Sequence, residues 1–124
     1  MSALISGSIA YDNIMVFPGR FQEQILPDQI HILNVAFLVP ELRREFGGCA
    51  GNVVYNLGLL GGKGYAMSTV GADFAPYASW LGEQNIDTRF IRQVASTLTA
   101  QAYTTTDLDD NPLTAFSPGP MGAA

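Results

Sequence analysis

Three glycines and an asparagine form the most informative group of residues in this chain. Gly47, Gly48 and Gly51 lie where a helix is expected to begin, and Asn52 follows directly. At a helix N-terminus the first backbone N–H groups lack partners within the helix, and the helix dipole favours negative charge. Glycines let a ligand approach the backbone closely, and the asparagine adds a donor and an acceptor. The pattern favours binding of a polyhydroxyl compound or an anion, with tight packing of the helix start as the alternative.

One carboxylate, Asp12, follows the first apolar segment of the chain. Residues 3–9 are a short apolar run that predicts a buried, central, parallel strand, and residues 10–13 are its polar end. Ligands of open α/β sheets gather at the carboxyl ends of strands, so Asp12 is a candidate ligand-binding residue. A turn in which the aspartate binds its own backbone is the alternative.

Several other chemistries find no support in the sequence. The glycines do not follow the dinucleotide-binding order, and Lys63 is followed by Gly64 rather than by the Ser or Thr of a P-loop. The acidic run 107–111 resembles a calcium loop but has Pro112 where that loop needs glycine, which favours an acidic hairpin turn. One cysteine (Cys49) and one histidine (His31) exclude an intrachain disulfide and ordinary zinc sites, and His31 is interpreted as a strand residue.

The elements that must position these residues alternate between strands and helices. Val53, Leu57 and Leu60 form an apolar stripe of a helix over residues 53–60 that Gly61 or Gly62 ends. A second helix is expected to run from an N-cap at Asp73 to Asn85, with Tyr77 and Trp80 on its core face. The expected strands are 3–9, 14–17, one or two edge strands within 25–39, 65–70 and 89–94, followed by a hairpin of 98–106 and 113–116, after which the chain has no closing element. This order predicts an α/β fold with a parallel sheet and a separate small sheet.

Composition fits a small globular domain. The chain has 124 residues, of which 48% are apolar and 14% charged, so it can form a core. Its net charge of −5 argues against nucleic acid, whose binding relies on dense positive charge. No apolar stretch reaches the roughly 20 residues of a membrane span, and the N-terminus lacks signal-peptide features. We therefore expect a cytoplasmic protein.

Three segments together resemble the N-terminal part of ribokinase-family (PfkB-type) carbohydrate kinases. They are Gly-Ser-Ile-Ala-Tyr-Asp at 7–12, the glycine–asparagine block at 46–62, and Val-Gly-Ala-Asp at 70–73. Residues 31–37 and 99–103 look most like the bacterial adenosine-kinase-like branch. The resemblance covers essentially the whole chain. It implies a doubly wound α/β/α fold with a small β-sheet lid, and transfer of the ATP γ-phosphoryl group to a sugar or nucleoside hydroxyl with Mg²⁺.

The resemblance also implies roles for individual residues. Asp12 matches the carboxylate that binds ribose hydroxyls, and Gly48 and Asn52 match sugar-contacting positions, with Ser8 as the small residue beside them. Tyr103 and Phe116 lie in the expected lid strands, where kinases of this type place aromatic side chains against the base.

Two family motifs are not found in these 124 residues: Asp-Thr-x-Gly-Ala-Gly-Asp, which carries the catalytic base, and Asn-x-x-Glu, which is tied to Mg²⁺ and phosphate. We therefore expect a truncated N-terminal part, with lid strands at about 12–40 and 97–117 and α/β elements at about 1–11 and 46–96. It would bind substrate, be inactive alone, and lack the ATP and Mg²⁺ sites. A non-catalytic nucleoside- or sugar-binding module, or one that forms a homodimer through the lid strands, is the alternative.

Overall fold

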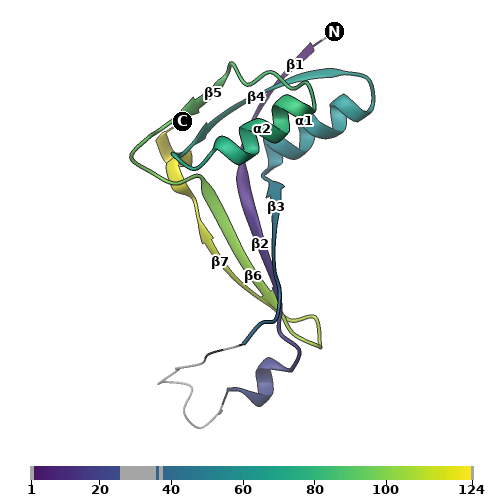
Figure 1. Cartoon of the computed structure of the whole chain (residues 1–124), viewed down its shortest axis with the longest axis vertical. Coiled ribbons are helices and arrows are strands. Elements are labelled where there is room, and N and C mark those ends of the chain that lie inside the picture. The colour runs from purple at the N-terminus through teal and green to yellow at the C-terminus, as the bar shows by residue number, and fades with distance from the viewer. Residues whose placement is uncertain (1, 26–35, 37, 124) are drawn as a thin grey trace.

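The computed structural model describes residues 2–25, 36 and 38–123, which form two β-sheets and two α-helices (Figure 1). The three-stranded sheet is parallel, with the order β1 (Ser2–Ser6), β4 (Lys63–Val70) and β5 (Ile91–Gln93). The four-stranded sheet has the order β3 (Leu42–Gly47), β2 (Ala10–Val16), β6 (Ala100–Thr106) and β7 (Pro112–Ser117). In it β2 runs parallel to β6, and the other two pairs are antiparallel.

Two helices lie against the three-stranded sheet. Helix α1 (Cys49–Leu59) leads into β4, and α2 (Ala75–Glu83) leads from β4 toward β5. Parallel strands need such crossovers, which explains the alternation of strands and helices in the sequence. The core combines residues of both helices, β4 and the start of β2: Ile9, Tyr11, Ala50, Val54, Ala66, Val70, Phe74, Tyr77 and Leu81. Figure 1 shows the four-stranded sheet extending away from the helices. The predicted α/β class is confirmed.

The first two strands differ from the expectation. A buried central strand over residues 3–9 was wrong, because β1 ends at Ser6, is mostly exposed, and among the described strands pairs only with β4. The chain bends after Ser6 and enters the other sheet at Ala10. Residues 10–16 are therefore one strand, and Asp12 lies within it rather than at a strand end.

Strand β3 was not predicted. Its sequence contains Arg43, Arg44 and Glu45, and it lacks the apolar alternation that signals a strand. It becomes a strand because it pairs with β2 along six residues. The Arg43 Nε atom lies 2.9 Å from Glu45 Oε1 on its exposed surface.

Helix α1 begins earlier than expected and buries a different face. The buried residues are Ala50, Gly51 and Val54, whereas Val53 and Leu60 of the predicted stripe are exposed. The small residues are needed because Ala50 packs against Gly7 and Gly51 leaves room for the Tyr77 hydroxyl. The predicted end is confirmed, since Gly61 has a φ of +85° directly after the C-cap.

Helix α2 ends as predicted but begins differently. Asn85 has a φ of +59° and follows the C-cap Gln84. Tyr77 is buried and Trp80 packs against the core, as expected. Asp73 is not the N-cap, which is Phe74 without a capping side chain. The Asp73 carboxylate instead accepts hydrogen bonds from the Thr99 N–H group, just before β6, and from the Gln101 side chain on β6.

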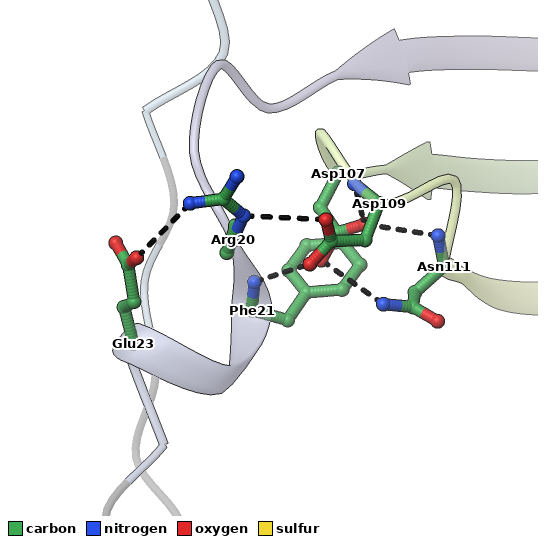
Figure 2. Close-up of polar contacts among 6 residues, drawn as sticks. All are labelled: Arg20, Phe21, Glu23, Asp107, Asp109 and Asn111. Carbon is green, nitrogen blue, oxygen red and sulfur yellow. Dashed lines mark hydrogen bonds and ion pairs between the residues drawn. The ribbon is translucent and has the colours of Figure 1, made fainter.

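The predicted hairpin is confirmed, and its turn is built around Asp107. This carboxylate is 3% exposed and accepts hydrogen bonds from the backbone N–H groups of Phe21, Asp109 and Asn111 at 2.9, 3.0 and 2.9 Å. Figure 2 shows these contacts together with the Arg20 guanidinium, whose Nε atom lies 3.2 Å from Asp109 Oδ1. The turn thus holds the short 3₁₀ helix η1 (Phe21–Glu23) to the end of the hairpin.

The end of the chain returns to the three-stranded sheet. Residues Gly119–Ala123 form short 3₁₀ turns with a kink at Pro120, whose carbonyl accepts a 2.8 Å hydrogen bond from Thr69 Oγ1. The expectation of no closing element was therefore wrong. His31 and most of the edge strands expected within 25–39 lie outside the described residues.

Candidate functional site

Asp12 lies on β2 with its carboxylate over the end of β3. Its Cα partners are Glu45 on β3 and Ala102 on β6. A Cβ atom at Gly47 would collide with the Asp12 carboxylate, so the missing side chain at this position makes room for it. Gly47 immediately precedes the turn that starts α1. The structure therefore brings Asp12 next to Gly47 of the glycine block.

The start of α1 is tied to the bend between β1 and β2. The Ser8 hydroxyl accepts a 2.9 Å hydrogen bond from Cys49 N, and the Ser8 carbonyl accepts bonds from Ala50 N at 2.9 Å and Gly51 N at 3.4 Å. The N–H groups that were expected to be available to an anion are thus occupied within the chain. Ser8 acts as the cap of a helix 41 residues away in sequence, which local patterns do not reveal.

Gly48 has a φ of +90°, and a Cβ atom there would lie 2.5 Å from the Ser8 carbonyl oxygen and 2.7 Å from Ile9 Cα. Only glycine fits this close crossing of two backbone segments. Asn52 is exposed in the first turn of α1, where its N–H donates to the Gly48 carbonyl at 3.0 Å. Its side chain borders a shallow apolar hollow beside Val53 and Asn56.

The two candidate aromatic residues lie on opposite faces of the four-stranded sheet. Phe116 pairs with Ala102, which pairs with Asp12, so these three side chains share one face. Tyr103 pairs with Asn13 and Ala115 and lies on the other face. Both rings are about half exposed, at 56% for Phe116 and 46% for Tyr103. The structure places Phe116 with Asp12 and separates Tyr103 from it.

A buried tyrosine supports the glycine block from below. The Tyr77 hydroxyl donates a 2.8 Å hydrogen bond to the Gly47 carbonyl, and a side chain at Gly51 would collide with that hydroxyl. Burial raises the pKa of Tyr77, and the nearby Asp12 carboxylate raises it further, so the phenol stays protonated and donates at neutral pH. This link could not be found from sequence because Tyr77 has the pattern of an ordinary core residue.

Sequence reasoning also missed a group of polar residues behind the site. Asn13, Arg44, Asp73 and Gln101 connect in one hydrogen-bonded cluster on the face opposite Asp12. Burial alone raises the pKa of the Asp73 carboxyl, but hydrogen bonds from Thr99 and the Arg44 charge outweigh burial and lower it. Asp73 is therefore ionised at neutral pH.

A hollow of about 290 Å³ lies at the carboxyl ends of β1 and β4. Its lining includes the hydroxyl-bearing residues Ser6, Ser8, Ser68 and Thr69. This is the edge at which open parallel sheets bind ligands. Across the described ranges no group of three or more His, Cys, Asp or Glu side chains could hold a metal ion. Within the same ranges no helix has the length and apolar character of a membrane span.

Comparison with known proteins agrees with this arrangement. Residues 8–123 match the pfkB family of carbohydrate kinases. A nucleoside kinase from Burkholderia thailandensis, solved with inosine, is 52% identical with a TM-score of 0.78 over 94% of this chain. The same kinase has been solved with ADP-inosine. A nucleoside kinase from Methanocaldococcus jannaschii is 26% identical with a TM-score of 0.80 over 95% of this chain, and Halothermothrix orenii fructokinase is 25% identical with a TM-score of 0.73 over 96%.

The chain spans little more than a third of these relatives: 36% of the Burkholderia kinase, 37% of the Methanocaldococcus kinase and 38% of the fructokinase. The family match covers the Asp12 strand, the glycine block and every described strand except β1. This chain belongs to the pfkB family of carbohydrate kinases.

Proposed function

We propose that this chain is the acceptor-binding part of a nucleoside kinase, which transfers the γ-phosphoryl group of ATP to a ribose hydroxyl. The observation that carries the proposal is the Asp12 carboxylate, held over Gly47 beside the start of α1. A carboxylate accepts hydrogen bonds from two neighbouring hydroxyls at once, and ribose offers such a pair. We include Ser8, Gly48 and Asn52 in the proposed site because the family resemblance implies it and because these residues are linked to one another at the start of α1.

Phe116 supports a nucleoside rather than a free sugar. Its half-exposed ring lies on the Asp12 face of the sheet, one strand beyond Ala102. An aromatic surface near the ribose site suits a purine base, which gains from stacking. The sequence favours adenosine, and the relative solved with inosine adds that nucleoside as a second candidate. Tyr103 is left out of the proposed site because it lies on the other face.

ATP and Mg²⁺ do not fit the described residues. The N–H groups at the start of α1 are taken by Ser8, and the described residues offer no acidic cluster for a metal ion. Phosphoryl transfer needs charge neutralisation and a positioned base. We propose that both sites and the catalytic base lie in sequence outside these 124 residues, and that the chain alone binds nucleoside without turning over ATP. We place the complete enzyme in the cytoplasm.

Isothermal titration calorimetry of the chain with adenosine, inosine, ribose and fructose tests the proposal. We expect nucleosides to bind more tightly than sugars, and Asp12→Ala to abolish binding without unfolding the chain. Asp110→Asn in the distant hairpin turn is a control for charge loss, since asparagine tolerates the φ of +59° at this position. Unchanged binding by Asp12→Ala would mean that the site lies elsewhere.

An ATP-turnover assay separates this proposal from its alternatives. Turnover by these 124 residues would contradict the placement of the donor site outside them. Binding without turnover, together with no kinase activity in the complete protein, would favour the non-catalytic module. A homodimer through the lid strands remains a prediction, which light scattering after size-exclusion chromatography can check.

A further inference from the structure

Four polar side chains meet where the two sheets join. Asn13 comes from β2, Arg44 from β3 and Gln101 from β6, and Asp73 lies between β4 and α2. Asn13 and Gln101 are only 6% and 5% exposed. Buried polar groups of this kind are costly unless their hydrogen bonds are made, so the arrangement of this cluster is strongly constrained.

Gln101 is the centre of the cluster. Its Nε2 atom donates to Asp73 Oδ2 at 3.0 Å, and its Oε1 atom accepts from Asn13 Nδ2 at 3.0 Å and from Arg44 Nη2 at 3.2 Å. The Arg44 guanidinium also lies 3.8 Å from the centre of the Tyr11 ring. One side chain thus joins a loop of the three-stranded sheet to two strands of the other sheet.

The chemistry of the partners fixes the orientation of the Gln101 amide. An ionised Asp73 only accepts hydrogen bonds, and the Arg44 guanidinium only donates them. The amide nitrogen must therefore face Asp73 and the oxygen must face Arg44. The other Asp73 oxygen accepts from Thr99 N at 2.7 Å, so neither carboxylate oxygen is free to change its role.

Further hydrogen bonds join residues 71–73, which precede α2, to residues 97–99, which precede β6, and to Tyr11. Gly71 N donates to Thr99 Oγ1 at 2.9 Å, Ala72 N donates to the Thr97 carbonyl at 2.8 Å, and the Tyr11 hydroxyl donates to the Asp73 carbonyl at 2.7 Å. Gln101 extends this line of bonds from β6 onto β2 and β3. It therefore links the Asp73 loop to three strands of the four-stranded sheet.

The cluster lies on the face of the sheet opposite to Asp12. Asn13 follows Asp12 on β2, and neighbouring residues of a strand point to opposite faces. Gln101 and Asn13 thus lie on the face away from Asp12 and do not touch a ligand bound there. They hold the strand that carries Asp12, whereas the glycine block is held by Ser8 and Tyr77.

We propose that Gln101 and Asp73 are positioning residues that set the place of Asp12 relative to the start of α1 and thereby the affinity for the nucleoside. This inference rests on the proposed function, because it takes Asp12 as the ribose ligand. The orientation of the Gln101 amide makes the inference testable by exchanging its donor and acceptor.

The test compares Asp73→Asn, Gln101→Glu and the double variant in this chain. Gln101→Glu places two carboxylates against each other, and Asp73→Asn places two amide donors against each other. In the double variant the new amide at position 73 donates to the new carboxylate at position 101, which still accepts from Asn13 and Arg44. The double variant has the same net charge as the wild type. Gln93→Glu, at an exposed position of β5, is the matched control.

Calorimetry with inosine and adenosine gives the dissociation constant of each variant, and thermal unfolding by circular dichroism gives its stability. We expect each single variant to bind about tenfold more weakly, since a buried hydrogen bond to a charged group is lost. The dissociation constant of the double variant should return to within about threefold of the wild-type value. Gln93→Glu should have the wild-type dissociation constant.

Each other result overturns part of the argument in a distinguishable way. Single variants with lower melting temperatures and unchanged affinity would show a purely structural role and overturn the inference alone. If the single variants do not fold, the double variant decides, and its failure to fold or bind would overturn the inference because it retains every hydrogen bond. A wild-type chain that binds no nucleoside would overturn the proposed function and this inference with it.

Discussion

At Gly48, both the backbone conformation and the surrounding atoms leave no room for a side chain. Its φ of +90° lies in a region that residues with a side chain rarely adopt. A Cβ atom added there would also collide with the backbone of Ser8 and Ile9. Its proposed role in binding is therefore inseparable from a structural one. Gly58 of the same helix has no atom within 4 Å of an added Cβ and no such constraint.

These two glycines predict opposite effects of the same substitution. Gly48→Ala should lower the free energy of unfolding by roughly 1–3 kcal/mol, because the strained backbone and the collision act together. Gly58→Ala, in the last turn of α1, should raise it by at most about 0.5–1 kcal/mol, because alanine loses less entropy than glycine in a helical conformation. Urea denaturation of the two variants measures both values. A Gly48→Ala chain as stable as Gly58→Ala would contradict the description of this turn.

At the scale of single elements, the turn of the β6–β7 hairpin is held by the Asp107 carboxylate. Burial alone raises the pKa of Asp107, but the N–H groups of Phe21, Asn111 and Asp109 outweigh burial and lower it below the ordinary 3.8. Because the pKa is lower in the folded state, the ionised carboxylate stabilises the fold above about pH 4. This contribution disappears as the pH falls through the folded-state pKa.

The pH dependence of thermal unfolding tests this element. Asp107→Asn should lower the melting temperature at pH 7, and the difference from the wild type should shrink as the pH falls below about 4. Asp110→Asn is the control in the same turn, since Asp110 is exposed and has a φ of +59° that asparagine tolerates. A difference that is constant between pH 2 and pH 7 would mean that the Asp107 charge does not stabilise the turn.

In the whole molecule, a few long-range contacts hold the two sheets together. One of these contacts is the buried hydrogen bond from the Tyr77 hydroxyl of α2 to the Gly47 carbonyl at the end of β3. The Tyr77 ring also packs against Tyr11, Phe46, Phe74 and Trp80. Removing the hydroxyl leaves these ring contacts in place and a buried carbonyl without its donor.

Tyr77→Phe should therefore cost about 1–3 kcal/mol of the free energy of unfolding, as for a buried acceptor left unsatisfied. Tyr55→Phe is the matched control, because within the described part of the chain the Tyr55 hydroxyl makes no hydrogen bond, while its ring packs on Trp80. Urea denaturation of both variants gives the comparison. Equal stabilities would show that the bond to Gly47 does not hold the sheets together.

The sequence by itself determined the features that depend on neighbouring residues. Gly61 and Asn85 end the helices, and the hairpin forms around an acidic turn. Positive φ angles, turn residues and motif order are local properties, so they can be recognised without the fold.

Only the tertiary structure decided how distant residues are used. It made a strand of the charged segment at β3, gave Ser8 the role of a helix cap, and moved Asp73 from capping α2 to binding Gln101. It also placed Tyr103 and Phe116 on opposite faces of one sheet. These outcomes depend on strand pairing and register between segments far apart in the chain, where a shift of one residue exchanges the two faces.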